Sequence, residues 1–141
     1  MKFTVNGIPR PLKRHRHTRN GRTYDPSVKD KQSFATQAAL KRPGEPLNGA
    51  LRLKLTFYMP RPKSHYRTGK RSHVLKAKAP VFHSIKPDLD NLVKLISDCI
   101  GRRTFIVDDS QICALASIKV YSDDLDWNND HPRTEVEIKE I

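Results

Sequence analysis

The segment from Lys86 to Gly101 constrains the fold more than any other part of the sequence. Because Pro87 disfavours the α conformation at the residue before it, the chain should enter this segment in an extended conformation. Apolar residues then recur at helical spacing, at Leu89, Leu92, Val93, Ile96 and Ile100. Gly101 stands where a left-handed cap would end a helix. The segment therefore predicts an amphipathic helix over residues 89–100.

Two aspartates flank the predicted start of this helix. Asp88 and Asp90 are two residues apart, which directs their side chains to one side in an extended chain but to different sides on a helix. They can share one metal ion only if Asp88 lies at the cap or before it. Mg²⁺ would suit such a pair, because it prefers carboxylate oxygens and keeps several waters. Alternatively, Asp88 caps the helix and Asp90 is a favourable first-turn acid. This segment alone leaves both interpretations open.

A second acidic pair follows the helix. Asp108 and Asp109 come after the apolar run 105–107 and before a predicted strand over residues 111–121. A turn between the helix and this strand could return Asp109 towards the first pair of aspartates. Three carboxylates would then be available to one divalent cation.

Taken together, these segments resemble the RusA family of Holliday-junction resolvases. The resemblance rests on Asp-Leu-Asp-Asn-Leu-x-Lys, an apolar-rich helix, an apolar run, Val-Asp-Asp-Ser-Gln and a strand, between about residues 86 and 121. It implies that Asp88, Asp90 and Asp109 are the metal-binding catalytic residues, and that Lys94 matches the family's helix lysine. It also implies four-way DNA junctions as the substrate and a homodimer with two active sites. Mg²⁺ is the expected cofactor.

The charge distribution predicts a polyanionic partner. The net charge is +12: residues 1–87 carry 21 lysines and arginines against 3 acids, and residues 88–141 carry 6 against 12. A basic half joined to an acidic half that holds the paired aspartates suits a nucleic acid and a cation site. The alternative is a solvated basic surface without a ligand, but the basic residues are clustered and interleaved with aromatic residues.

Two acid-free basic segments, at about residues 10–24 and 60–86, hold the candidates for DNA contact. Both are predicted as loops. The first carries the turn signal Asn20-Gly21. The second has neither helical nor strand periodicity, and a loop of this length is usually functional or disordered. The candidate DNA-binding residues are Lys13, Arg14, Arg16, Arg19, Arg22, Arg67, Lys70, Arg71 and Lys86.

The remaining segments predict an α+β fold for one domain over residues 1–141. Alternating or apolar patterns predict strands at residues 3–9, 51–59, 111–121 and 134–141. Either Asp25 before Pro26, or Ser27 with Asp30, should begin a first helix. The expected order is β-α-β-(basic loop)-α-β-β, with one mixed sheet and two helices on one face.

Other features argue against several classes of protein. No apolar stretch is long enough to cross a membrane, and the first residues suit a strand and not a signal peptide. Cys99 and Cys113 are expected to be buried free thiols, which suits a reducing, cytoplasmic compartment. No glycine-rich phosphate loop is present, so no nucleotide cofactor is expected. A calcium-loop-like pattern from Asp124 to Glu135 lacks the central glycine and helical flanks, which favours a solvated loop.

The sequence therefore predicts a Mg²⁺-dependent endodeoxyribonuclease that resolves four-way junctions in recombination and repair. Asp108 is expected to be a less important neighbour of the metal ligands. Two alternatives stay open: a metal-dependent nuclease for other branched DNA, and a non-catalytic nucleic-acid-binding protein whose aspartates only cap helices and form turns.

Overall fold

A computed structural model describes residues 1–122 and 131–141. Its centre is a four-stranded sheet with the strand order β1-β6-β4-β5. The strands are β1 (Lys2–Asn6), β4 (Leu51–Met59), β5 (Ile112–Tyr121) and β6 (Arg133–Glu140). β4 pairs in parallel with β5 and antiparallel with β6, while β1 pairs antiparallel with β6. The sheet is therefore mixed, as predicted.

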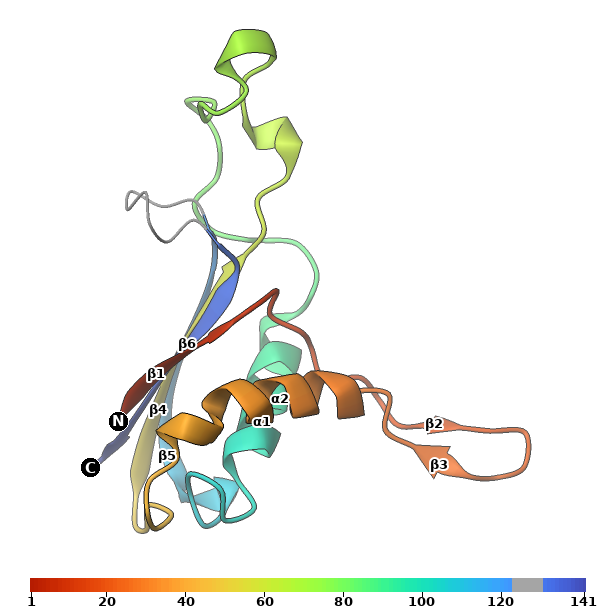
Figure 1. The fold of residues 1–141 in the computed structure, drawn as a ribbon, viewed down its shortest axis with the longest axis vertical. Coiled ribbons are helices and arrows are strands. Elements are labelled where there is room, and N and C mark those ends of the chain that lie inside the picture. The colour runs from red at the N-terminus through yellow and green to blue at the C-terminus, as the bar shows by residue number, and fades with distance from the viewer. Residues whose placement is uncertain (123–130) are drawn as a thin grey trace.

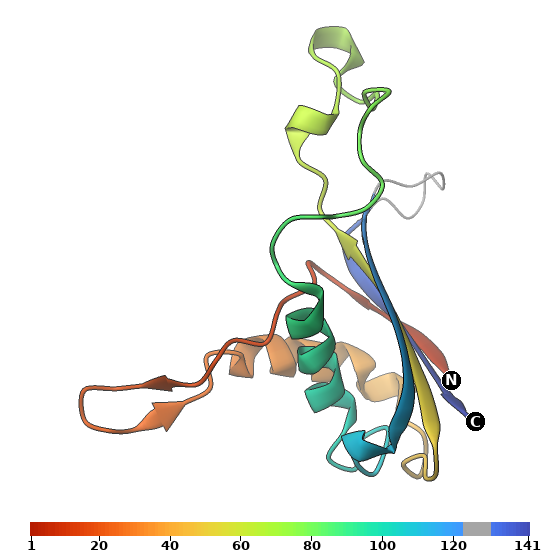
Figure 2. The same cartoon turned by 180° about the vertical axis from the view of Figure 1, so that it is seen from behind.

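Two helices, α1 (Val28–Ala38) and α2 (Leu89–Ile100), cover one face of this sheet (Figure 1, Figure 2). A short 3-10 helix, η1 (Ala39–Lys41), extends α1 and stops before Pro43. The arrangement confirms the predicted α+β class, including both helices on one side. Within the described ranges, no helix combines the length and the apolar character needed to cross a bilayer.

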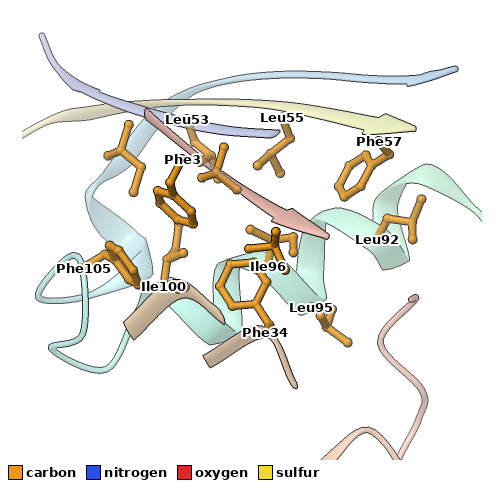
Figure 3. Close-up of a cluster of buried hydrophobic side chains, with 14 of the residues drawn as sticks. Phe3, Phe34, Leu53, Leu55, Phe57, Leu92, Leu95, Ile96, Ile100 and Phe105 are labelled. Atoms are coloured by element: carbon orange, nitrogen blue, oxygen red, sulfur yellow. The ribbon is translucent and has the colours of Figure 1, made fainter. Parts of the chain in front are cut away.

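The core lies between β4 and α2 and is closed by three phenylalanines (Figure 3). Phe3 of β1 stacks on Phe105 with 4.9 Å between ring centroids, and Phe34 of α1 meets Phe3 edge-on at 6.2 Å. Alternate residues of β4 and the apolar face of α2 fill the space between them: Leu53, Leu55, Phe57, Leu92, Leu95, Ile96 and Ile100. Burial of this face fixes the rotation of α2, so its polar face must point to solvent.

Two glycines set element ends in different ways. β1 ends at Asn6, earlier than predicted, because Gly7 turns the chain with a φ of 113°. α2 ends before Gly101 as predicted, but the expected left-handed cap is wrong, since Gly101 has a φ of −71°. A Cβ at Gly101 would lie 3.1 Å from the Ser97 carbonyl oxygen, a tight contact that favours glycine at this position. The left-handed conformation falls instead on Arg102 and Arg103, with φ of 52° and 60°.

Both predicted basic loops contain short regular elements. The basic hairpin (residues 14–24) is formed by β2 (Arg16–His17) and β3 (Thr23–Tyr24), whose strands are too short to show a periodicity. The basic arm (residues 60–86) contains the 3-10 helices η2 (Lys63–His65) and η3 (Gly69–Arg71). Both segments project from the body of the molecule in different directions (Figure 1).

The base of the basic hairpin is tied to both helices. Ser27 is the N-cap of α1, but its side chain does not cap the helix. Its Oγ accepts a hydrogen bond from the Lys13 amide at 2.8 Å, and its own amide donates to Asp25. Lys31 of α1 places its Nζ 2.8 Å from Asp25 and 2.9 Å from Asp98 of α2. One half-buried ammonium therefore connects the hairpin base, α1 and α2.

The two cysteines differ in exposure. Cys99 is half-buried, and burial raises the pKa of its thiol to about 11. Cys113 is exposed, which corrects the expectation that both thiols are buried. It lies on β5, the edge strand, which pairs with β4 alone within the four-stranded sheet. Most of the calcium-loop-like pattern, at residues 124–130, lies outside the described residues.

Candidate active site

Asp88 occupies the N-cap position of α2 without acting as a capping group. Its backbone is extended, with φ −70° and ψ 140°, and its side chain makes no capping hydrogen bond. The structural condition for a shared metal ion is therefore met, since Asp88 precedes the first helical residue and Asp90 lies in the first turn. The capping interpretation fails for the Asp88 carboxylate, which is exposed to solvent.

Asp90 forms an ion pair with Lys94 on the exposed face of α2. The Lys94 Nζ lies 3.0 Å from the Asp90 carboxylate, one helical turn away. This hydrogen bond holds the pKa of Asp90 below its usual value, so the carboxylate is ionised at neutral pH. Both side chains remain more than half exposed, and solvent screens a pair of this kind so strongly that it contributes little to stability. The pair is therefore easily opened by a ligand.

Both residues of the second acidic pair are exposed, but only Asp108 has a structural role. Asp108 is the N-cap of the 3-10 helix η4 (Asp109–Gln111) and forms a capping box with it. Its carboxylate accepts a hydrogen bond from the Ser110 amide at 2.9 Å, and the Gln111 side chain accepts one from the Asp108 amide at 2.9 Å. Hydrogen bonding from Ser110 lowers the pKa of Asp108. Asp109 has no such role in η4 and is exposed.

Within one chain, the two acidic sites lie at opposite ends of α2. The backbone of Asp109 approaches Gly101, just after the helix, whereas Asp88 and Asp90 lie at its start. A helix of 12 residues is about 18 Å long. Among residues 1–122 and 131–141, no three histidine, cysteine or acidic side chains come together as metal ligands. The expectation that the turn returns Asp109 to the first pair is therefore wrong for a single chain.

The path of the chain after α2 explains this separation. The amides of Phe105 and Ile106 both donate to the Ile100 carbonyl, at 3.0 and 3.1 Å, and both side chains are buried. Their burial holds the connection at the end of the helix, so η4 cannot run back along it. β5 then begins beside η4, and its far end reaches the start of α2. Lys119, not Asp109, is the residue that arrives beside Asp88.

Lys119 is a site residue that sequence reasoning missed. Its Nζ donates hydrogen bonds to the carbonyl oxygens of Ile85 at 2.6 Å and Pro87 at 2.5 Å. Burial lowers the pKa of Lys119, and the nearby charge of Asp88 partly opposes this shift. The lysine fastens the segment that carries the aspartates to β5. The available signal was that Lys119 is the one charged residue of β5.

Comparison with known families identifies the chain. The family model for endodeoxyribonuclease RusA matches residues 5–139. The chain belongs to the RusA family of endodeoxyribonucleases. A search of curated proteins found no match. The match extends the resemblance seen between residues 86 and 121 to nearly the whole chain, so the basic hairpin and the basic arm both lie within the RusA-matched region.

In this RusA-family chain, α2 begins in the angle between the two basic projections (Figure 1). Arg14, Arg16, Arg19 and Arg22 are exposed on the basic hairpin, and Lys13 is exposed at its base. Arg67, Lys70 and Arg71 are exposed on the basic arm. Lys86, also exposed, directly precedes the aspartate segment. The cations predicted to contact DNA thus lie on two separate surfaces that meet near Asp88.

Replacing Lys119 by methionine should destabilise the RusA fold near the aspartates. The substitution removes two hydrogen bonds from a charged donor, which are together expected to contribute about 2 kcal/mol, or several degrees in Tm. Differential scanning calorimetry would measure the shift. Lys139→Met, at an exposed position of β6, is the matched control and should change Tm little. Equal Tm values for the two variants would contradict a structural role for Lys119.

Proposed function

We propose that this RusA-family chain is a Mg²⁺-dependent nuclease that resolves four-way DNA junctions during recombination and repair. The observation that carries the proposal is the position of Asp88 and Asp90. Both carboxylates are exposed, and that of Asp88 makes no capping hydrogen bond. They lie where the basic hairpin and the basic arm converge. A DNA backbone attracted by the flanking cations would reach an acidic pair suited to a divalent ion.

The donor set fits a hard divalent cation. Asp88 and Asp90 would hold the ion through carboxylate oxygens, the ligands that Mg²⁺ prefers, with water completing its shell. Bound Mg²⁺ would polarise a phosphoryl oxygen and lower the pKa of a bound water. Lys94 would leave its ion pair with Asp90 and bind the phosphate. Its positive charge would then offset the negative charge that develops on the phosphate in the transition state.

The third proposed ligand, Asp109, requires a second chain. Because Asp109 lies at the other end of α2 from Asp88 and Asp90, it cannot join them without rearranging the helix connection. We infer that the protein is a homodimer in which the partner subunit's Asp109 completes each set of three carboxylates. A two-fold dimer would repeat this arrangement and carry two equivalent sites. Two sites suit a reaction that must cut two strands of one junction.

Cleavage of a labelled four-way junction tests the function. The protein should cut it in Mg²⁺ and not in EDTA, and should cut linear duplex and flap substrates much more slowly. Equal cleavage of flaps and junctions would favour a nuclease for other branched DNA. Binding without cleavage under every divalent metal would favour a non-catalytic DNA-binding protein and would refute the proposed enzyme.

The basic arm should supply DNA affinity electrostatically. Neutralising phosphates releases counterions, so the logarithm of affinity should fall linearly with the logarithm of salt concentration. Replacing Arg67, Lys70 and Arg71 by alanine should weaken binding and flatten this slope by about one unit for each phosphate that the variant no longer neutralises. Fluorescence anisotropy across a salt series in EDTA would measure the slope. Folding should persist, because the three side chains are exposed.

The outer face of the sheet offers a matched control for this variant. Arg52, Lys54 and Lys139 are exposed there and carry the same total charge. Their replacement by alanine should leave the salt slope unchanged. If both triple variants flatten the slope equally, net charge and not the basic arm determines affinity. An unchanged slope in the arm variant would show that these residues do not contact phosphate.

A further inference from the structure

A cavity of about 690 Å³ opens beside Asp88, which forms part of its wall. Its walls are formed by the segment 8–13 after β1, Asp30 of α1, the end of β4 with Pro60, and the segment from His83 to Asn91 that leads into α2. The Leu12 amide donates to the Asn91 carbonyl oxygen at 2.8 Å, which fastens the first wall to the helix. This contact holds one wall to the folded body, whereas Pro60, His83 and Lys86 belong to the base of the basic arm.

Its lining combines apolar surface with cations. Ile8, Pro9, Pro11, Leu12, Met59 and Pro60 supply the apolar part. Arg10, Lys13 and Lys86 also line the cavity and are exposed, so their charges face its solvent side. A nucleotide has the complementary properties, because its base has apolar faces and its phosphate is an anion. The volume lies within the range of about 300–1,000 Å³ that is typical of small-molecule sites.

Polar groups in the same walls are available to the edge of a base. Asn91, half-buried on α2, lines the cavity together with Asp88. His83 lines it as well and is only 6 % exposed. The His83 Nδ1 has no hydrogen-bond partner among the described residues. The wall therefore contains one buried ring nitrogen, the His83 Nδ1, that meets the geometric criteria for no hydrogen bond within the described part of the chain.

We propose that this cavity takes one nucleobase, unstacked from the junction, next to the scissile phosphate. The inference rests on the proposed function, because Asp88 belongs both to the proposed metal pair and to the cavity wall. Phosphates held by Arg10, Lys13 and Lys86 would place a nucleotide at the cavity mouth beside Asp88, with or without a metal ion there. Bases at the crossover of an open junction lack a stacking neighbour across the branch point, so their extrusion costs less than that of a base inside a duplex arm.

The competing arrangement uses the same cations without a base in the cavity. The sugar-phosphate backbone would then pass along Arg10, Lys13 and Lys86, and the apolar walls would stay empty. Salt dependence cannot separate the two arrangements, because both neutralise phosphates. Filling the cavity separates them: Ile8→Trp adds bulk at a side chain that is 44 % exposed and leaves all three cations in place.

The test uses junctions that carry a single 2-aminopurine at successive positions around the crossover. Fluorescence is recorded on binding in EDTA, where the proposed nuclease does not cut. Wild-type protein should raise the fluorescence several-fold at one position on each cut strand. Ile8→Trp should abolish that rise while binding the junction with an unchanged salt slope. Leu40→Trp, at a position 93 % exposed near the end of α1, is the control and should behave like wild type.

An abasic substitution at the reporting position gives an independent readout. The abasic junction should lower the kcat/KM of wild-type protein by about tenfold, as expected for loss of one stacked base. The kcat/KM of Ile8→Trp should be nearly the same on the abasic and the intact junction. A thermal melt verifies folding of the variant, and Pro60→Trp replaces it if Ile8→Trp does not fold. A fluorescence rise that survives in the cavity-filled variants, or that is absent in wild type, would overturn the proposal. Failure of wild-type protein to cut junctions in Mg²⁺ would instead reject the proposed function, which the EDTA measurement does not assume.

Discussion

Replacing Asp88, Asp90 or Asp109 by asparagine should abolish junction cleavage and leave junction binding nearly intact. Each substitution removes one carboxylate charge and keeps the side-chain size, whereas binding rests on the cations of the basic hairpin and the basic arm. The expected loss is about a thousandfold in cleavage rate, or about 4 kcal/mol of transition-state stabilisation. Single-turnover cleavage in Mg²⁺ and gel-shift titration in EDTA measure the two quantities separately.

Asp108→Asn is the matched control for Asp109→Asn. Asparagine accepts a capping hydrogen bond as aspartate does, so η4 should survive and cleavage should fall much less. The opposite order would mean that Asp108 is the metal ligand and that its capping box is incidental. Cleavage at the wild-type rate in any of the three aspartate variants would remove that residue from the proposed site.

Two inactive variants should recover cleavage when they are mixed. If each site takes Asp90 from one chain and Asp109 from the other, a heterodimer of Asp90→Asn and Asp109→Asn has one doubly substituted site and one intact site. Random exchange would then restore about a quarter of the wild-type sites, with only one active site in each restored dimer. The product should therefore be a nicked junction. Denaturing gels of the two labelled strands would detect it.

The mixing experiment requires proof that heterodimers form. Light scattering should give twice the chain mass, and native mass spectrometry of one variant labelled with heavy isotopes should reveal the mixed species. Mixtures of Asp88→Asn with Asp90→Asn provide the control. They should stay inactive, because both residues come from the same chain and every site keeps one substitution. Heterodimers without cleavage would show that each chain builds its own site, and a monomeric mass would reject the shared site altogether.

The parts of the fold that the sequence predicted well are those with a long, regular pattern. Strict alternation marked β4, and five apolar residues at helical spacing marked α2, with bounds that the structure reproduces. Both elements bury one face in the core, so burial imposes the same periodicity on structure and sequence. The start of α2 followed as well, because Pro87 disfavours the α conformation at Lys86 and the helical spacing of apolar residues begins at Leu89.

The parts that sequence reasoning missed depend on contacts between distant segments. β2 and β3 are two residues each, too short for a period. The hydrogen bonds from Lys119 to Ile85 and Pro87 join positions more than thirty apart in sequence. The place of Asp109 was mispredicted because burial of Phe105 and Ile106, not the turn itself, decides where η4 lies. The periodicity of a short segment does not reveal which distant residues it will contact.

The strand order β1-β6-β4-β5 has a consequence for folding. The last strand in the sequence lies between the first strand and β4, so β1 has no partner in the sheet until β6 arrives. Until then, Phe3 cannot be held against Phe105, and one edge of β4 remains open. Contacts of such long sequence separation slow folding, because the entropy of closing the loop precedes any gain from packing. On a ribosome, this nuclease should therefore stay without its complete core until β6 has left the exit tunnel.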